Sequence, residues 1–304
     1  MQILSFYRHQ SFLLFSLLFI VASGTLFSQG SVVTWGSDNS GGDSSSVASS
    51  LNSGVIEIFS TERAYAALKS DGSVVTWGSS DYGADSSSVA SSLSSGVTQI
   101  FSTQKAFAAL KSDGSVVTWG DSDYGGDSSS VTGLNTGAGV TEIFSNDWSF
   151  AALKSDGSVV TWGSSDYGAD ISSVSSSLSS GVTQIFSNKT SFAALKSNGR
   201  VVTWGSSSVG GDSSSATGLN TGAGVTEIFS NNWSYAALKS DGSVVAWGYS
   251  TSNYGAVSPS SLSGVTEISS TERAFAALKS DGSVVTWGDS NYGGDTSSSA
   301  TPPP

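Results

Sequence analysis

The sequence predicts an all-β protein of the β-propeller class, and three observations support this prediction. Trp-Gly pairs recur at intervals of 40 to 43 residues, at Trp35, Trp77, Trp119, Trp162, Trp204, Trp247 and Trp287. An Asp-Gly or Asn-Gly pair stands between two apolar runs in six of these units. The units are also rich in Gly, Ser, Thr and Val, which are weak helix formers. A period of this length made of strands and tight turns is typical of repeated β-blades.

One unit shows the expected elements. Residues 96–102 (GVTQIFS), 106–112 (AFAALKS) and 115–119 (SVVTW) read as three strands, and the polar loop that follows leaves room for a fourth. Asp113-Gly114 predicts a tight two-residue hairpin, in which both central residues have positive φ. Val116 and Thr118 should face one side, and Val117 and Trp119 the other. Since both sides are partly apolar, we expect each sheet to lie between two neighbours, with the tryptophans packed between blades.

The number of blades follows from counting strands. Seven third strands are present, but only six first strands and six second strands. We therefore expect six full blades plus a half blade, which together fill about seven positions of a ring. A closed six-bladed ring is the alternative, and a truncated chain is a third possibility. A stacked parallel solenoid fits less well, because tight hairpins join antiparallel strands.

The repeat also resembles a known family. The stretch ALKSDGSVVTWGDSDYGGD at residues 109–127 is similar to the regulator of chromosome condensation repeat, and the resemblance extends from about residue 31 to 295. It implies a propeller, usually of seven blades, that serves binding or exchange functions in different members. This chain has Ala or Ser where the family often has His, and GAD or GGD where it has Gly-Gln-Leu-Gly. The resemblance therefore implies the fold and assigns no partner-contacting residue.

The first 28 residues predict export. Residues 11–24 (SFLLFSLLFIVASG) have the length of a signal-peptide core and are followed by small residues. We expect a signal peptide at 1–28, a propeller at 29–299 and a tail at 300–304, and hence a secreted or cell-surface protein. An uncleaved signal segment would be its one link to a membrane. Without residues 1–28 the chain has 11 basic and 24 acidic residues, a net charge of −13, which disfavours nucleic acid as a partner.

The residue types argue against catalysis. The chain has no Cys, and its one His, His9, lies in the expected signal peptide. A serine nucleophile would lack its usual base, and the six lysines of the AALKS strands occupy a repeated structural position. Asp121, Asp123 and Asp127 match a calcium loop only in part, since Gly125 stands where a ligand would be expected. We therefore expect no enzyme activity, no cofactor and no metal.

The turn before the second strand is the candidate binding site. It varies from unit to unit while the strands barely change, reading TERA, TQKA, NDWS, NKTS, NNWS and TERA. Variable turns on a rigid scaffold often carry recognition, and Trp is a common interface anchor. We expect partner contacts from six residues of these turns, namely Arg63, Lys105, Trp148, Lys189, Trp233 and Arg273.

The sequence thus predicts an exported, monomeric, non-enzymatic propeller that binds an unknown protein through its loops. A carbohydrate-binding surface module, with loop tyrosines such as Tyr82 and Tyr124 stacking on sugars, is the alternative. A hydrolase is a more remote one.

Overall fold

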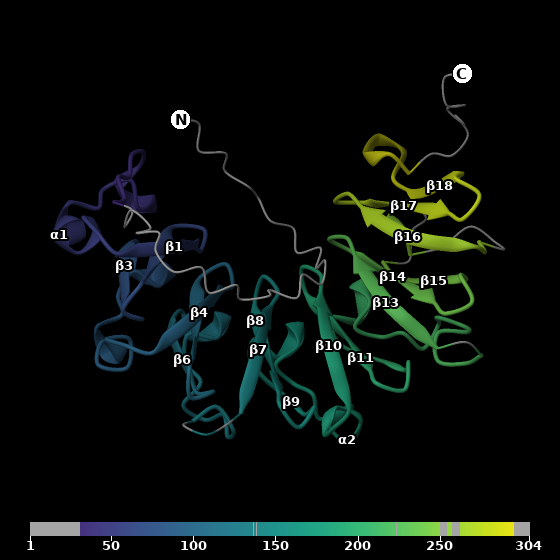
Figure 1. The fold of residues 1–304 in the computed structure, drawn as a ribbon, viewed down its shortest axis with the longest axis horizontal. Coiled ribbons are helices and arrows are strands. Elements are labelled where there is room, and N and C mark those ends of the chain that lie inside the picture. The colour runs from purple at the N-terminus through teal and green to yellow at the C-terminus, as the bar shows by residue number, and fades with distance from the viewer. Residues whose placement is uncertain are drawn as a thin grey trace, which may run out of the picture.

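The computed structural model describes residues 31–135, 137, 139–222, 224–249, 254–256 and 262–294. Within them the chain forms six separate three-stranded antiparallel sheets. The sheets follow one another around an arc, with consecutive sheets packed face to face (Figure 1). These are the blades of a β-propeller, and the predicted fold class is confirmed.

Each sheet is built from one continuous repeat, and its strands pair in sequence order. The strands are β1 (Val55–Ser60), β2 (Ala64–Lys69), β3 (Val74–Gly78), β4 (Val97–Ser102), β5 (Ala106–Lys111), β6 (Val116–Gly120), β7 (Val140–Ser145), β8 (Ser149–Lys154), β9 (Val159–Gly163), β10 (Val182–Ser187), β11 (Ser191–Lys196), β12 (Val201–Gly205), β13 (Val225–Ser230), β14 (Ser234–Lys239), β15 (Val244–Gly248), β16 (Val265–Ser270), β17 (Ala274–Lys279) and β18 (Val284–Gly288).

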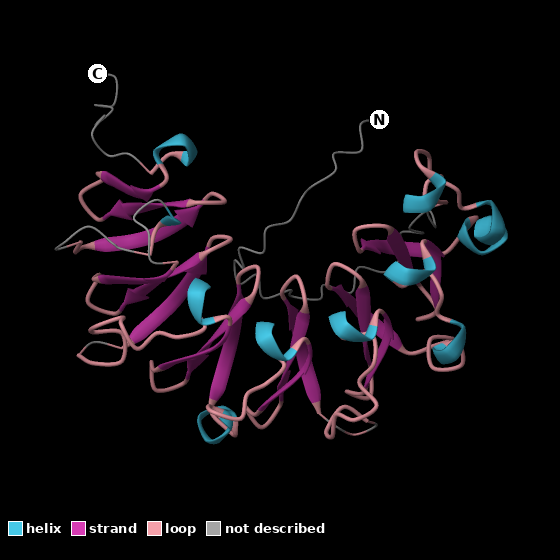
Figure 2. Cartoon of the chain, turned by 180° about the vertical axis from the view of Figure 1, so that it is seen from behind, coloured by secondary structure: helices cyan, strands magenta, loops and turns pink. Residues whose placement is uncertain are grey.

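The loops after the third strands form short helical turns and no fourth strand in the described residues (Figure 2). The 3₁₀ turns are η1 (Asp38–Ser40), η2 (Ser45–Val47), η3 (Ser80–Tyr82), η4 (Ser87–Val89), η5 (Ser122–Tyr124), η6 (Ser165–Tyr167), η7 (Ser207–Val209) and η9 (Ser290–Tyr292), and the α-helical turns are α1 (Ala48–Leu51) and α2 (Ser175–Leu178).

The hairpin between the second and third strands differs from the prediction of a two-residue turn. The N–H of Gly72 donates to the carbonyl of Lys69, and the N–H of Lys69 donates to the carbonyl of Ser73. The loop is therefore three residues long, a β-turn followed by one glycine at positive φ, and Gly72 has φ +77°. Asp71 favours this form because its Oδ1 accepts bonds from both the N–H and the hydroxyl of Ser73. Asp-Gly thus predicts a turn correctly but does not distinguish these two lengths.

Tryptophans secure each junction between blades, as predicted. Trp119 is 2% exposed, stacks on Phe107 of its own sheet at 5.2 Å, and donates from Nε1 to the carbonyl of Gly83 in the preceding repeat. Val117 lies on the same side as Trp119, and Val116 packs against the following sheet. Both sides of each inner sheet are therefore buried against its neighbours.

The repeated lysines have a structural role, also as predicted. Lys111 Nζ donates to the carbonyl of Ser92 at 2.8 Å, and Lys69 Nζ donates to that of Ser50 at 2.9 Å. Each lysine thereby satisfies a carbonyl of the segment that precedes its own sheet.

The arc is open. Sheet β1–β2–β3 and sheet β16–β17–β18 lie at its two ends in Figure 1, so the described residues do not form the closed six-bladed ring that was the alternative. The prediction of six full units plus a half is confirmed, because residues 31–51 form a half unit ahead of the first sheet. This half unit supplies only a segment equivalent to a third strand, not itself in a sheet, and its loop, which leaves the seventh position incomplete.

The expected signal peptide and C-terminal tail, residues 1–28 and 300–304, lie outside the described residues, so these remain predictions. Where the structure is described, no helix has the length and apolar character needed to span a bilayer.

Candidate functional site: a cation–aromatic row on the inner rim

The six variable turns lie on the inner side of the arc. In Figure 1, α2 lies on the outer side just before β10 begins, so the turn that follows β10 lies at the inner end of its sheet. The equivalent turns occupy the same place in the other five repeats, because every sheet has the same strand order. The fold thus gathers six sequence-distant turns onto one rim.

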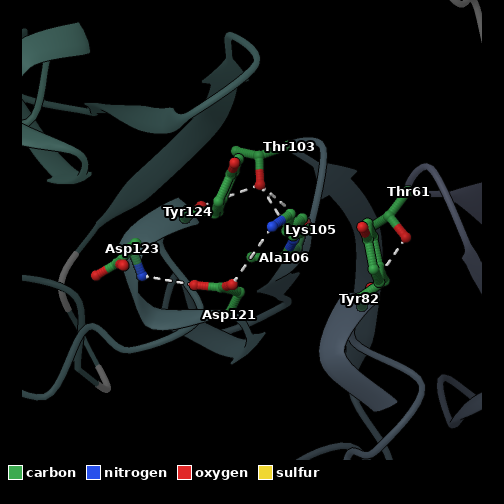
Figure 3. A network of polar contacts seen from close by, with 8 residues as sticks. All are labelled: Thr61, Tyr82, Thr103, Lys105, Ala106, Asp121, Asp123 and Tyr124. Atoms are coloured by element: carbon green, nitrogen blue, oxygen red, sulfur yellow. Dashed lines mark hydrogen bonds and ion pairs between the residues drawn. The ribbon is translucent and has the colours of Figure 1, made fainter. Parts of the chain in front are cut away.

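The first and fourth residues of each turn are structural. Thr103 is buried; its hydroxyl accepts the N–H of Ala106 and donates to the carbonyl of Tyr124 (Figure 3). In the third repeat Asn146 makes the equivalent bonds: its Oδ1 accepts the N–H of Ser149, and its Nδ2 donates to the carbonyl of Tyr167. Turns that begin with Thr therefore end with Ala, and turns that begin with Asn end with Ser. Both pairs make the same buried hydrogen bonds. The two middle residues of each turn lie outside this buried pattern.

The second residues tie the blades together. In the first five repeats the backbone N–H of this residue donates to the backbone carbonyl of its counterpart in the next repeat, at 3.0 to 3.4 Å. This chain of bonds runs through Glu62, Gln104, Asp147, Lys189, Asn232 and Glu272. The turns are therefore held in fixed register, and side chains on them are presented on a rigid backbone.

The third residues interleave with loop tyrosines. Arg63 lies 5.0 Å from the ring centre of Tyr82, and Lys105 lies 5.3 Å from Tyr82 and 4.6 Å from Tyr124. Trp148 stacks on Tyr124 at 4.3 Å and meets Tyr167 at 5.0 Å. Cations and rings thus form one continuous row across the first three repeats.

A second stretch of the same kind begins at Lys189 of the fourth repeat and continues through the last two full repeats. Lys189 lies 5.7 Å from the ring of Trp233, which contacts Tyr254 at 5.6 Å. Arg273 lies 5.4 Å from Tyr254 and 4.8 Å from Tyr292. We call the two stretches together the rim ladder, made of Arg63, Tyr82, Lys105, Tyr124, Trp148, Tyr167, Lys189, Trp233, Tyr254, Arg273 and Tyr292.

The fourth repeat interrupts the rim ladder. Its turn has Thr190 at the third position, and its loop has the buried Val209 where the other repeats have tyrosine. The hydroxyl of Tyr235 reaches into this place and donates to the carbonyl of Ser191 at 2.8 Å. The two stretches therefore flank a smaller, less aromatic segment.

The rim ladder also concentrates positive charge in an acidic protein. Of the 12 Lys and Arg residues, six are the repeated hairpin lysines, Arg8 precedes the described residues, and Arg200 lies at an outer hairpin. The remaining four are all on the inner rim, namely Arg63, Lys105, Lys189 and Arg273. Two of them have carboxylate partners within 4 Å, Lys105 with Asp121 at 3.9 Å and Arg273 with Asp289 at 3.7 Å.

Asp147 is the most perturbed acid of the rim. Burial raises the pKa of its carboxyl and the nearby Glu62 adds to this, while Lys189 and a hydrogen bond from Gln104 oppose the shift. The charged form of Asp147 is therefore disfavoured in the folded chain.

All six predicted site residues lie on this rim, but they are not equivalent. Arg63, Lys105, Trp148, Trp233 and Arg273 stand at third positions, whereas Lys189 stands at a second position and reaches Trp233 of the next repeat. Sequence reasoning treated the tyrosines that complete the row as a separate feature. The available signal was their place in the loop after the Trp-Gly pair, which returns to the turn of the same repeat: four of the five tyrosines lie five residues after the tryptophan, and Tyr254 lies seven after Trp247.

The carboxylates considered for calcium are used within the loop. Asp121 accepts the N–H of Asp123 and pairs with Lys105 (Figure 3), and Asp127 accepts the N–H of Ser129. Among the described residues, no group of three or more His, Cys, Asp or Glu side chains is placed to hold a metal ion.

Tyr82 and Tyr124, the tyrosines considered for sugar stacking, already have two ring contacts each. Tyr124 has Lys105 and Trp148 as close ring contacts, and Tyr82 has Arg63 and Lys105. These contacts reduce the ring area that is open for stacking on a sugar. A groove of about 580 Å³, lined in part by Lys196, Asn198 and Arg200, lies at the opposite, outer ends of the strands.

Comparisons with known proteins bear on the fold alone. No family model matches the chain, and no curated protein matches it. Among solved structures it is similar to the Physcomitrella patens receptor kinase CR4 ectodomain (16% identity, 77% of this chain and 62% of that chain, TM-score 0.43). It is also similar to the CRINKLY WD40 ectodomain of the Arabidopsis thaliana receptor kinase ACR4 (15%, 77% and 80%, TM-score 0.44) and to Prp20p of Saccharomyces cerevisiae (14%, 77% and 72%, TM-score 0.45).

Prp20p is also described as yeast RCC1, so the resemblance expected from the repeat is found among solved structures, at low identity. The chain spans about three fifths of the length of the Physcomitrella ectodomain. The descriptions of the yeast structures concern binding of Prp20p to Gsp1p and histones and of yeast RCC1 to Kap60. At these identities and TM-scores the likeness carries no argument about function, and the propeller assignment stands on the six sheets themselves.

Proposed function

We propose that this protein is an exported, non-enzymatic β-propeller scaffold that binds a protein partner through the rim ladder. One observation carries the proposal. The six turns that vary between otherwise similar repeats lie on one rim, where cationic, Tyr and Trp side chains form two rows on either side of the fourth repeat. Trp, Tyr and Arg are the side chains that most often dominate protein–protein binding energy.

The rigidity of the rim supports the same function. The turns are fixed by backbone bonds between blades, and Trp148 is held against Tyr124 and Tyr167 before any partner arrives. Side chains that are ordered in advance lose less conformational entropy on binding. A pre-ordered row therefore suits a recognition surface.

The test compares capture of partners by the wild-type chain and by the Trp148→Ala plus Trp233→Ala double variant. Both are used as bait against surface and secreted material of the host, and the bound proteins are quantified. We expect at least a tenfold loss of the specific partner with circular dichroism unchanged. The matched control is Arg200→Ser, which removes an exposed cation from an outer hairpin where the other repeats have Ser. Equal capture by wild type and double variant would rule out the rim ladder as the site.

Export and the monomeric state are separate parts of the proposal. We expect the chain in the extracellular fraction with an N-terminus created by cleavage near residues 24–28, which N-terminal peptide mass spectrometry can detect. Light scattering should give the mass of a single chain. Retention of an intact N-terminus in the cell interior would contradict export without affecting the binding test.

A further inference from the structure

The half unit at the start of the described chain is shaped like the third strand and loop of a complete repeat. The N–H of Val32 donates to the carbonyl of Leu51 at 3.1 Å, as that of Val74 does to Leu93 at 3.0 Å. The hydroxyl of Thr34 donates to the carbonyl of Gly42, as that of Thr76 does to Ala84. Leu51 is fully buried against the first sheet. Residues 32–51 therefore keep two hydrogen bonds and the buried leucine that characterise the equivalent part of a full blade.

The segment of residues 32–36, equivalent to the third strand of a full blade, has no pairing partner in the part of the chain that is described. In the first sheet the equivalent strand β3 pairs with β2, and Trp77 stacks on Tyr65 at 5.3 Å. Trp35, the equivalent of Trp77, is 83% exposed, whereas the six other Trp-Gly tryptophans are 2–4% exposed. A Cβ built on Gly36 meets nothing within 4 Å, whereas one on Gly78 meets the carbonyl of Arg63.

The same missing strand leaves the first sheet uncovered on that side. Ile58 is 44% exposed, although its equivalent Ile100 is 2% exposed because Ala64, Ala66 and Leu68 of the preceding sheet cover it. A second strand beside residues 32–36 would place such small residues and a leucine over Ile58. Its aromatic residue, on the other side, would stack on Trp35. One strand thus accounts for both exposed apolar residues.

We propose that residues 32–36 form an acceptor edge for strand addition by another protein, independently of the rim ladder. The occupant is an extended segment with the pattern small–aromatic–small–small–Leu, paired antiparallel to the edge. The six complete sheets define this pattern, because AYAALK, AFAALK, SFAALK or SYAALK pairs with the equivalent strand in each. Backbone bonds to the open edge supply affinity, and alternate side chains supply specificity.

The experiment uses the full chain and a synthetic 19-residue peptide with the sequence of residues 96–114 (GVTQIFSTQKAFAALKSDG), which carries a first and a second strand. Calorimetry measures binding, and hydrogen exchange measures the backbone of residues 32–36. We expect saturable binding, slower exchange in that segment and a blue shift of tryptophan fluorescence. A peptide with Gly in place of Phe107, the aromatic residue of the second strand, should bind at least tenfold more weakly.

Two chain variants assign the site. Trp35→Ala removes an exposed side chain, so the fold should persist while peptide affinity falls at least tenfold. Val284→Ala, which truncates a 59% exposed side chain at the opposite end of the arc, should leave affinity unchanged. Absence of binding, or equal binding by Trp35→Ala and wild type, would overturn the proposal.

Two other occupants would also overturn it. Peptide binding that requires removal of residues 1–29 would show that the chain's own preceding residues fill the edge. Self-association that Trp35→Ala abolishes, with no peptide binding, would assign the edge to a second copy of this chain.

Discussion

Trp148 lies almost flat on Tyr124, with ring centres 4.3 Å apart and an angle of 20° between the ring planes. This contact joins the scaffold to the candidate site, because Tyr124 is 8% exposed and its carbonyl is bonded by the buried Thr103. Lys105 also lies within cation–π distance of the Tyr124 ring. A residue of the variable turn is thus built into the junction between the second and third repeats.

The Trp148→Ala variant should lose stability as well as binding. Stacked aromatic pairs contribute about 0.5–1.5 kcal/mol beyond the area they bury, so we expect about 1 kcal/mol or more of destabilisation in chemical denaturation. Trp233→Ala is the comparison, since Trp233 meets its tyrosine neighbours at 5.6 and 6.0 Å in tilted and edge-on arrangements. Equal losses in the two variants would show that the flat stack adds nothing specific.

Replacing a glycine that packs against the next blade by alanine should destabilise the fold. A Cβ on Gly125 would lie 2.7 Å from the ring of Phe150 in the next sheet, and its φ is +92°. Gly293 has nearly the same φ, +91°, but a Cβ there meets nothing within 4 Å. Gly293→Ala should therefore incur only the backbone strain of about 1–2 kcal/mol.

Gly125→Ala should be destabilised by that strain plus a steric term of about 1–3 kcal/mol. Urea denaturation of the two variants measures the difference directly. The close packing of repeats deduced here would be refuted by equal midpoints, because the backbone term is common to both.

The sequence predicts the repeat well, for a physical reason. Its signals are local and recur in every repeat. They are the period of the Trp-Gly pairs, the alternation of Val and Trp, and the residues of the turns. The predicted length of the hairpin loop was wrong because Asp-Gly suits both a two-residue and a three-residue loop. The three-residue form also occurs in the fourth repeat, where Asn198 accepts the N–H of Arg200 as Asp71 accepts that of Ser73.

The rim ladder was predicted only in part. The turns were recognised from their variability, but a single unit does not reveal that Tyr82 of one repeat and Lys105 of the next come within 5.3 Å. The exposed state of Trp35 was not foreseen either, because its local sequence is the same as that of the buried tryptophans. Contacts between repeats depend on which residues the neighbouring repeats place there, and the sequence of a single repeat does not contain this information.

The hydrogen bond from tryptophan to the preceding repeat should contribute measurably to stability. Trp204 Nε1 donates to the carbonyl of Gly168 at 3.1 Å, whereas the buried Nε1 of Trp162 has no hydrogen-bond partner. Phe substitution truncates the indole in both cases, but only Trp204→Phe leaves a buried carbonyl unpaired. We expect Trp204→Phe to be less stable than Trp162→Phe by about 1–3 kcal/mol in denaturation experiments. Identical stabilities would show that this bond is energetically neutral.

Asp147 should make the stability of the chain depend on pH. Its pKa is raised in the folded state, chiefly by burial, so between its ordinary value of 3.8 and the folded value the folded chain binds more protons than the unfolded chain. Stability from this group is therefore greatest at low pH and falls as pH rises through that window.

Asp147→Asn removes the titration while an amide oxygen can still accept the bond from Gln104. The variant should gain stability relative to wild type as pH rises from 3.5 to about 7, a range that spans the titration of a raised carboxyl. Urea midpoints of both chains across this range test the sign. Glu227→Gln is the matched control at a second acid whose pKa is raised by burial and by the nearby Glu267. A constant difference between wild type and Asp147→Asn at every pH would contradict the raised pKa, and a difference that shrinks with rising pH would reverse its direction.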